Sequence, residues 1–221
     1  MRDTSIKAYK GLGMEGMIAN WYASTTLKGL DEYQVLARRV AQVLAPGSKV
    51  LEVAPGPGYF ALELTKLGNF QIAGLDISRT FVEIARKNAE EAGVAVDFRQ
   101  GNASAMPFEN DCFDYVLCRA AFKNFTEPLL ALEEMHRVLA KGGTALIIDL
   151  RKDAPRKSIS QYVDGMKVNA LNAAFMKLTF RFMLLKRAYT KSDFEKFLSR
   201  VDFGRVEIRE SLTGLEIELQ K

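Results

Sequence analysis

Cysteine and histidine are scarce in this chain of 221 residues, which has two cysteines, Cys112 and Cys118, and a single histidine, His136. Both cysteines fall in or beside one apolar, strand-like run whose direction keeps them apart, so no disulfide framework is predicted. Clusters of histidine and cysteine with ligand spacing are missing too, and we expect no metal site. The scarcity of cysteine favours a thiol-reducing, cytoplasmic location.

Long apolar runs are also missing. No run is long enough to span a bilayer, and the first residues lack the charged, apolar and small-residue order of a signal peptide. Apolar residues still make up 48% of the chain, enough for a full core at this length. We therefore expect one soluble domain over residues 1–221.

Acidic residues are scarce between residues 151 and 190, where nine Lys and Arg stand against two Asp, a local net charge of +7. The whole chain has a net charge of +4, so the basic character belongs to this segment alone. A segment of this kind can bind the phosphates of a nucleic acid or an anionic membrane surface. Residues 151–187 could therefore make a peripheral membrane contact.

A turn rich in glycine and proline, Pro55-Gly56-Pro57-Gly58, interrupts the apolar pattern after residues 50–53. An apolar-periodic segment begins at Phe60, which predicts a buried strand, a tight turn and a helix. Gly56 and Gly58 lack a Cβ atom where the backbone could approach a ligand, and the amides that open the next helix point to the same place. A strand-to-helix turn without a ligand is the alternative reading.

From residue 49 onward, predicted strands alternate with predicted helices. The strands are expected at 49–53, 70–76, 94–100, 112–118 and 144–150, and the helices at 59–67, 79–92 and 128–139, after a first helix at 31–45. Strands separated by helices indicate right-handed crossovers and a parallel sheet covered on both faces. The sheet is therefore the centre of the predicted fold.

The two ends of the chain break this alternation. Residues up to about 30 mix glycines with large side chains and are expected to be irregular, as a flap, a tail or a partner-binding arm. Residues 158–188 have a helical period with two apolar stripes, one of them rich in Met. A capping box formed by Thr190 and Asp193 begins a helix that ends near residue 200, and two strands at 203–209 and 212–219 read as a hairpin.

Polar side chains are expected at the carboxyl ends of the strands, where open parallel sheets bind their ligands. Asp76 follows the second strand, and its carboxylate can accept both hydroxyls of a ribose. Asn102 follows the third strand, where its amide could read the edge of a base. Together with the glycine turn, these residues predict a pocket for an adenosine.

Four runs of the sequence carry a family resemblance: VLEVAPGPGYF, GLDIS, GNASAMPFENDCFDYVLCRAAFKNF and ALEEMHRVLAKGGTALIIDL. They resemble the class I S-adenosylmethionine-dependent methyltransferases, in the branch with the ubiquinone and menaquinone biosynthesis enzymes and many small-molecule methyltransferases. The resemblance covers residues 49–150. It implies a Rossmann-like, doubly wound α/β fold with a mostly parallel seven-stranded sheet, an antiparallel C-terminal strand and helices on both faces.

The composition and periodicity of the two ends, taken together with this resemblance, predict a division of a single methyltransferase domain over residues 1–221. Residues 1–30 would be an N-terminal flap and residues 31–150 the cofactor-binding core. Residues 151–190 would be a helical cap inserted after strand five, and residues 191–221 the closing helix and hairpin. The implied cofactor is S-adenosylmethionine.

Five residues near the glycine turn have roles by resemblance. Glu52, Gly56 and Gly58 would surround the methionine part of the cofactor, and Asp76 would hold its ribose. Ala54 stands where the family has the first glycine of the turn, a departure that we expect to shift the backbone only slightly.

Four further positions complete the implied cofactor site. Ile77 would pack on the adenine, and Asn102 and Ala103 would face its amino edge. Arg119 would begin the floor beside the sulfonium. Asn102 replaces the usual Asp, so it can still accept a hydrogen bond but adds no negative charge.

No catalytic base is identified from the sequence, and one is needed only if the acceptor carries its proton into the reaction. Lys123-Asn124 stands where many relatives have histidine, which excludes a histidine base there. His136 and Cys118 are expected to have packing roles. The weak candidates for a base or an orienting group are Tyr9, Tyr22, Lys123, Asp149 and Tyr162.

The acceptor is expected to be small and to have an apolar or aromatic body, because Trp21 and the Met-rich stripe are available to line its pocket. The acceptor atom, O, N, S or C, and the oligomeric state are not predicted. A nicotinamide-dependent oxidoreductase is the first alternative, since residues 56–61 also satisfy G-x-G-x-x-G/A. A methyltransferase acting on RNA or on a membrane-associated quinone-like lipid is the second, although the motif of adenine-amino methylation is missing after strand four.

Overall fold

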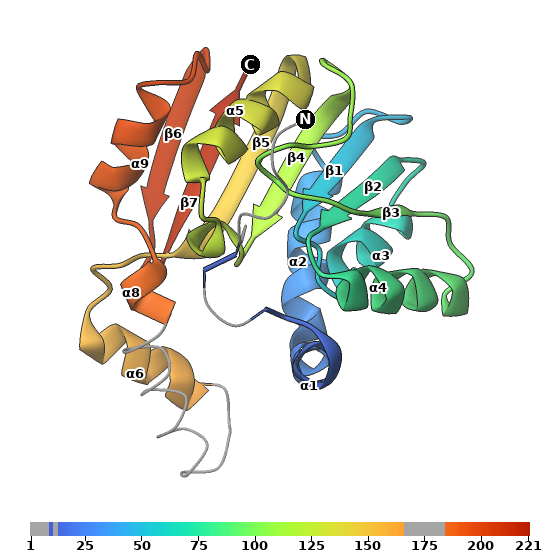
Figure 1. The fold of residues 1–221 in the computed structure, drawn as a ribbon, viewed down its shortest axis with the longest axis horizontal. Coiled ribbons are helices and arrows are strands. Elements are labelled where there is room, and N and C mark those ends of the chain that lie inside the picture. The colour runs from blue at the N-terminus through green and yellow to red at the C-terminus, as the bar shows by residue number, and fades with distance from the viewer. Residues whose placement is uncertain (1–8, 11–12, 166–183) are drawn as a thin grey trace.

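The computed structural model describes residues 9–10, 13–165 and 184–221. A seven-stranded sheet in the order β3-β2-β1-β4-β5-β7-β6 runs through the molecule, with helices on both faces (Figure 1). Its strands are β1 Lys49–Val53, β2 Gln71–Asp76, β3 Asp97–Gln100, β4 Phe113–Arg119, β5 Leu139–Leu150, β6 Arg205–Glu210 and β7 Gly214–Gln220. β1 to β5 pair in parallel, and β7 pairs antiparallel with both β5 and β6. The predicted Rossmann-like fold is confirmed.

Successive residues of β1 point into two different cores. Val50 enters the core beneath the helices that follow β1 and β2, and Leu51 enters the core on the opposite face. Both side chains are fully buried, as expected for a strand covered on both faces.

The helices of the described chain are α1 Gly16–Thr26, α2 Leu30–Ala41, α3 Tyr59–Thr65, α4 Arg79–Glu91, α5 Pro128–Val138, α6 Arg156–Gly165, α8 Leu185–Arg187 and α9 Lys191–Leu198, with short 3₁₀ helices η1 Leu27–Gly29 and η2 Phe122–Asn124.

The start of β5 differs from the sequence-based expectation. The strand begins at Leu139, and its pairing with β4 shifts register between Phe113 and Tyr115. Gly142, with a φ of 77°, supplies the left-handed residue that this irregularity requires. The expected turn before strand five is therefore accommodated as a bulge within a longer strand.

The N-terminal expectation of irregular structure is wrong over residues 16–29, which form α1 and η1. The helix was not recognised because its buried positions are Ala19 and Ala23, while Met17, Ile18 and Trp21 face outward. An apolar period therefore does not mark the buried face. Among the described residues, no helix is long and apolar enough to cross a membrane.

The C-terminal elements follow the sequence-based expectation where they are described. The capping box is present, because the Asp193 amide donates to Thr190 Oγ1 at 3.1 Å and the Thr190 amide donates to Asp193 Oδ2 at 2.9 Å. β6 and β7 form the predicted hairpin. Helix α6 extends to Gly165, the last described residue before 184, so the break expected near Gly165 is not tested. Both apolar stripes predicted for 158–188 fall mainly in residues 166–183, outside the described residues.

Candidate functional site

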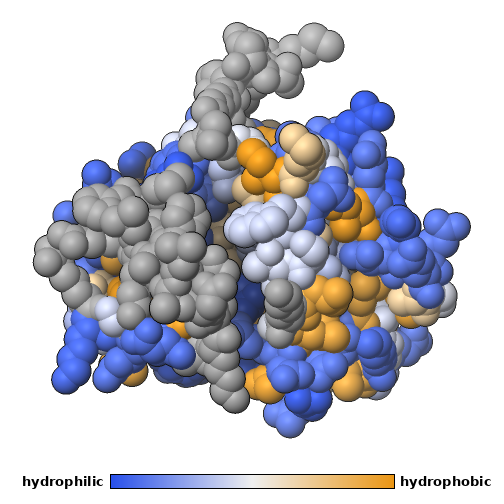
Figure 2. Space-filling model, turned by 90° about the horizontal axis from the view of Figure 1, so that it is seen from below, coloured by the Kyte–Doolittle hydropathy of each residue, from blue (hydrophilic) through white to orange (hydrophobic). Residues whose placement is uncertain are grey.

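The strand order reverses between β1 and β4, since β2 and β3 continue from one side of β1 and β5 continues from the other side of β4. Ligands of open α/β sheets bind outside the carboxyl ends of the strands at such a point. Figure 2 looks onto this edge of the molecule from below. The sheet therefore brings the residues predicted at the strand ends to one side of the molecule.

Asp76 links the end of β2 to the glycine turn after β1. Its Oδ2 accepts a hydrogen bond from the Gly56 amide at 3.0 Å, and its Oδ1 accepts one from the Ser78 amide at 2.9 Å. Burial raises the pKa of this carboxyl to about 6, although these amide hydrogen bonds favour its ionised form. Each carboxylate oxygen retains a second lone pair, so the side chain can still accept hydrogen bonds from a ligand.

The two glycines of the turn serve different purposes. A Cβ atom on Gly58 would lie 2.7 Å from the Phe98 ring, so packing on β3 already requires glycine there. A Cβ atom on Gly56 would meet nothing within 4 Å, so the backbone faces open space. Both residues have positive φ, 81° for Gly58 and 55° for Gly56. Open space beside the backbone is what close approach by a ligand needs.

Backbone strain gathers at the ends of β1 and β4. Ala54 has a φ of 57° and Ala120 a φ of 59°, the left-handed conformation that costs a residue with a side chain roughly 1–2 kcal/mol. The Ala54 amide donates to the Leu75 carbonyl at 2.7 Å, which holds the strained residue in place. Alanine at the first glycine position thus keeps a left-handed backbone.

Glu52 is a buried charged residue of the site with an unsatisfied oxygen. The side chain is 3% exposed, and its Oε2 has no hydrogen-bond partner among the described residues. Burial raises the pKa of the carboxyl to about 8, against the smaller opposing effects of the Ala61 amide and the Arg119 charge. A buried carboxyl without a full set of partners is unusual in a folded protein and marks a position where a ligand can complete the interactions.

Lys123 and Asp149, two candidate bases, form a buried ion pair. The Lys123 Nζ atom lies 2.8 Å from Asp149 Oδ1, and the Lys123 amide donates to Asp149 Oδ2 at 2.8 Å. Lys123 Nζ also donates to the carbonyl of the strained Ala120. The pair therefore holds the loop after β4 in position.

Tyr9 and Tyr22 bring the N-terminal segment over the strand ends. Tyr9 forms an isolated antiparallel bridge with Phe125, and the Tyr22 ring packs edge-to-face on Phe81 at a centroid distance of 5.8 Å. Burial raises the pKa of both phenols, and the nearby charges of Asp76 and Asp149 raise it further. Both phenols therefore remain protonated near neutral pH and can donate hydrogen bonds. Tyr162, the last candidate, lies in α6, and its side chain falls outside the described atoms.

Arg119 is anchored to helix α2. Its Nη2 lies 2.5 Å from Glu32 Oε2, and its guanidinium stacks over the Tyr33 ring at 4.4 Å. This pairing could not be predicted from the sequence, because Glu32 and Tyr33 are remote from Arg119 in the chain. The contacts fix the guanidinium beside the end of β4.

Ile77, Asn102 and Ala103 lie at the ends of β2 and β3. The large apolar side chain of Ile77 is exposed. Ala103 packs against the core on the face of the sheet that Leu51 enters. Asn102 Oδ1 accepts a hydrogen bond from the Ser104 amide at 2.9 Å, which leaves its amide nitrogen as a donor.

Glu15 is a residue of the site region that the sequence did not indicate. Its carboxylate accepts hydrogen bonds from the Arg79 and Thr80 amides, both at 3.0 Å, at the start of α4. Ser78 Oγ also donates to the Met14 carbonyl at 2.6 Å. The first turn of α4 has no acidic residue of its own, which is the one signal that a carboxylate from elsewhere could satisfy these amides.

Roles were also predicted for three further residues, Trp21, His136 and Cys118, and the structure shows where each of them lies. Trp21, expected to line the acceptor pocket, is 65% exposed. His136 packs edge-to-face on Phe203 at 5.0 Å, in agreement with a packing role. Cys118 is buried, and burial raises the pKa of its thiol, so it has the properties of a core residue and not of a nucleophile.

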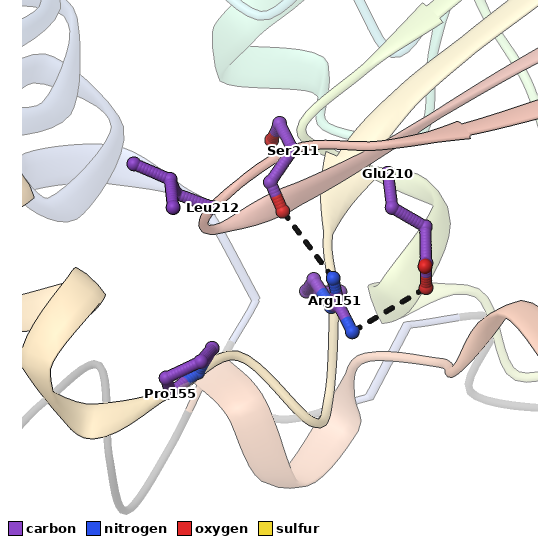
Figure 3. A pocket seen from close by; sticks show the side chains of 5 residues that line it. All are labelled: Arg151, Pro155, Glu210, Ser211 and Leu212. Carbon is purple, nitrogen blue, oxygen red and sulfur yellow. Dashed lines mark hydrogen bonds and ion pairs between the residues drawn. The ribbon is translucent and has the colours of Figure 1, made fainter.

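Two surface hollows do not involve the predicted cofactor residues. One, of about 590 Å³, lies beside Arg151 and the β6–β7 turn, where the guanidinium contacts Glu210 at 3.3 Å and the Ser211 carbonyl at 3.3 Å (Figure 3). The other, of about 780 Å³, runs past the amino ends of β2, β3 and β4. Since Arg151 is already engaged by neighbouring oxygens, we assign no ligand to the first hollow.

A family model described as a methyltransferase domain matches residues 51–147. The demethylmenaquinone methyltransferase of Chlorobaculum tepidum is 29% identical over 189 residues, which are 81% of this chain and 76% of that protein. The ubiquinone/menaquinone biosynthesis C-methyltransferase of Wigglesworthia glossinidia brevipalpis is 35% identical over 111 residues, 48% of this chain and 44% of that protein. The matched family region begins in β1 and ends in β5, and so contains the glycine turn.

The fold also resembles solved structures. A putative S-adenosyl-L-methionine-dependent methyltransferase from Methanococcus maripaludis superimposes with a TM-score of 0.76, over 96% of this chain and 95% of that chain. The sequences are 21% identical, so this likeness concerns the fold.

Proposed function

Since this chain belongs to the class I S-adenosylmethionine-dependent methyltransferases, in the branch of the ubiquinone and menaquinone enzymes, we propose that its acceptor is a small molecule with an apolar or aromatic, quinone-like body. Methyl transfer from S-adenosylmethionine to a small molecule is the activity of the family. The family match does not favour a nicotinamide-dependent oxidoreductase. The observation that carries the cofactor site is the buried Glu52 carboxyl with an unsatisfied oxygen beside the glycine turn.

The residues around the turn fit the amino-acid half of the cofactor. S-adenosylmethionine carries a positive sulfonium and a positive amino group, and either cation would give the buried Glu52 carboxylate a partner. A pyrophosphate carries no positive charge and would give the Glu52 carboxylate no such partner. The open space at Gly56 admits the cofactor close to the backbone. We propose as cofactor-binding residues Glu52, Ala54, Gly56, Gly58, Asp76, Ile77, Asn102, Ala103 and Arg119.

The adenosine half would lie toward β2 and β3. Asp76 would accept hydrogen bonds from the ribose hydroxyls with the lone pairs not used by Gly56 and Ser78. Ile77 offers an exposed apolar side chain for the adenine face, and Asn102 and Ala103 would meet its amino edge. Residues 31–150 would then form the cofactor-binding core, with 1–30 and 151–190 as flap and cap.

The residues near the acceptor are suited to positioning and not to proton abstraction. When bound, the cofactor supplies an electrophilic methyl group, which the acceptor atom must meet in line. Tyr9 and Tyr22 would donate hydrogen bonds to an acceptor oxygen, because burial keeps both phenols protonated. The Lys123–Asp149 pair would hold the loop at Ala120 as a fixed wall. An acceptor that ionises readily, such as a quinol or phenol, fits a site without a free base.

A methylation assay with radiolabelled S-adenosylmethionine tests this proposal. A panel of short-chain quinols, phenols, heterocycles, thiols and RNA would be offered, and we expect label in the quinols or phenols. Glu52→Gln, which keeps the size of the buried side chain, should weaken donor binding in a calorimeter while leaving the circular dichroism spectrum unchanged. Tight NADH binding without S-adenosylmethionine binding, or label in RNA alone with a steep salt dependence, would contradict it.

A further inference from the structure

Helix α1 buries two alanines and exposes three large apolar side chains. Ala19 is fully buried and Ala23 is 7% exposed, whereas Met17 is 89% exposed, Trp21 65% and Ile18 44%. Positions 17, 18 and 21 lie on one face of the helix. We call Met17, Ile18 and Trp21 the α1 ridge. A helix in contact with water alone would place such side chains on its buried face.

The α1 ridge differs from the other exposed apolar residues in the described chain. Those residues stand on separate elements and are the single exposed side chains that every protein has: Val35, Val43, Leu67, Ile77, Val206 and Leu212, with Leu27 alone following the ridge. Apolar side chains gather beside a central hollow on the face shown in Figure 2, with hydrophilic side chains around the rim. Contiguous exposed apolar surface of this kind marks an interaction site.

Contacts of α1 with α3 and α4 place the α1 ridge beside the candidate cofactor site. Tyr22, its neighbour in sequence, packs on Phe81 of α4. The Tyr59 hydroxyl donates to the Ala23 carbonyl at 3.0 Å, and Glu15 accepts hydrogen bonds from the first amides of α4. One side of α1 therefore contributes to the site, while the opposite side presents the ridge to the surroundings.

The charge around the α1 ridge identifies the partner. Helix α1 has no charged residue, and residues 151–190 carry a local net charge of +7. Helices α6 and α8 of this basic segment lie on the same side of the molecule as α1 (Figure 1). Lys152 and Lys157 are exposed there. Apolar side chains, an interfacial tryptophan and lysines on the same side of the molecule together match an anionic lipid surface. Two copies of this face would bring their basic segments together and repel one another.

We propose that the α1 ridge docks the protein on an anionic lipid bilayer, where an apolar acceptor can pass from the lipid to the strand-end site. The purpose of this docking rests on the proposed function. The contact itself involves neither the cofactor nor the acceptor, so it can be measured without activity. Met17, Ile18 and Trp21 would enter the headgroup boundary, and Lys152 and Lys157 would lie near the lipid phosphates.

Trp21 is the single tryptophan of the chain and reports directly on the contact. We expect its emission to shift to the blue when the full chain meets vesicles of phosphatidylglycerol and phosphatidylcholine, and the protein to sediment with them. Pure phosphatidylcholine should bind less protein, and salt should weaken the anionic binding. Met17→Ser/Ile18→Ser should weaken vesicle binding roughly tenfold or more. Calorimetric affinity for S-adenosylmethionine should not change.

The matched control is Val43→Ser/Leu67→Ser, which removes two exposed apolar side chains near the amino ends of β1 and β2. It should bind vesicles like the unchanged protein. Equal losses in both double variants, no shift of Trp21 emission, or light scattering that shows self-association through the α1 ridge would overturn the proposal. Vesicle binding that persists when no acceptor is methylated would refute the proposed function and leave the docking intact.

Discussion

The central sheet and helix α1 distribute their side chains in opposite ways. In β1, Val50 and Leu51 are buried in two separate cores, and the strand has large apolar residues where the fold needs them. In α1, the buried positions are alanines, and Met17 and Trp21 face outward. The sheet is thus stabilised by burial of large side chains, while α1 is held by small side chains and by specific polar contacts. The large outward side chains of α1 remain available to a partner.

The largest expected effect on stability comes from breaking the buried ion pair beneath the site. Lys123→Met leaves the Asp149 carboxylate buried without its cation, which should lower the free energy of unfolding by about 3–5 kcal/mol. Urea denaturation measures this loss. Lys123→Met/Asp149→Leu should recover most of it, because no charge is then left unpaired. The exposed pair Lys87–Glu91 is the control, and Lys87→Met should change stability by about 0.5 kcal/mol or less. A loss below about 1 kcal/mol in Lys123→Met would contradict the structural role of the pair.

Glu52 should make stability fall as the pH rises. The carboxyl has a pKa of about 8 in the folded chain because of burial, above the value it has when the chain unfolds. The folded state therefore binds the proton more tightly, and its contribution to stability is complete below the unfolded pKa and is lost as the pH rises through 8. Denaturation between pH 5 and pH 9 should show this loss, by a few kcal/mol at most, and Glu52→Gln should remove it. An unchanged pH profile in Glu52→Gln would contradict the burial of an uncompensated carboxyl.

The two glycines of the turn allow the effect of packing on stability to be measured separately from the effect of ligand approach on binding. Gly58→Ala should lower stability by roughly 2–4 kcal/mol, because the added methyl meets Phe98 and the φ of 81° is strained. Gly56→Ala should lower stability by only about 1 kcal/mol, since its methyl meets no protein atom. The second variant should nevertheless bind S-adenosylmethionine more weakly, as measured by calorimetry. Unchanged cofactor affinity in Gly56→Ala would remove this glycine from the proposed site.

Removal of the Glu15 contact should have the smallest effect on the stability of the protein. Glu15→Ala leaves two amides of α4 to water, at a cost of about 1 kcal/mol or less in this exposed position. We expect faster hydrogen exchange in α1 and an unchanged urea midpoint, because α1 is attached to the core by few contacts. Glu83→Ala, which removes an exposed ion pair within α4, is the control. If exchange in α1 were the same in both variants, Glu15 would not hold the helix.

The elements that could be predicted from the sequence are those with local signals. Alternating periods gave the strands, and Thr190 with Asp193 gave the start of α9. The strand ends gave Asp76 as a residue beside the glycine turn, and the structure shows the hydrogen bond from Gly56 that joins them. These features depend on residues close in sequence or on the general geometry of parallel sheets.

The features that could not be predicted depend on residues far apart in the chain. The Lys123–Asp149 pair and the contact of Gly58 with Phe98 arise only when the sheet has formed. The Glu15 contact with α4 joins segments separated by more than sixty residues. Helix α1 was missed because the usual rule, large apolar residues inside, does not hold there. Each of these features depends on tertiary contacts that exist only in the folded chain.

The most direct test of the central claim is a calorimetric titration of the chain with S-adenosylmethionine near pH 7, in buffers of different ionisation enthalpy. The Glu52 carboxyl, with a pKa of about 8, is largely protonated at this pH and should lose its proton when a cation binds beside it. We therefore predict binding accompanied by proton release, and the loss of that release in Glu52→Gln. No binding of S-adenosylmethionine, or equally tight binding with the same proton release in Glu52→Gln, would contradict the site proposed here.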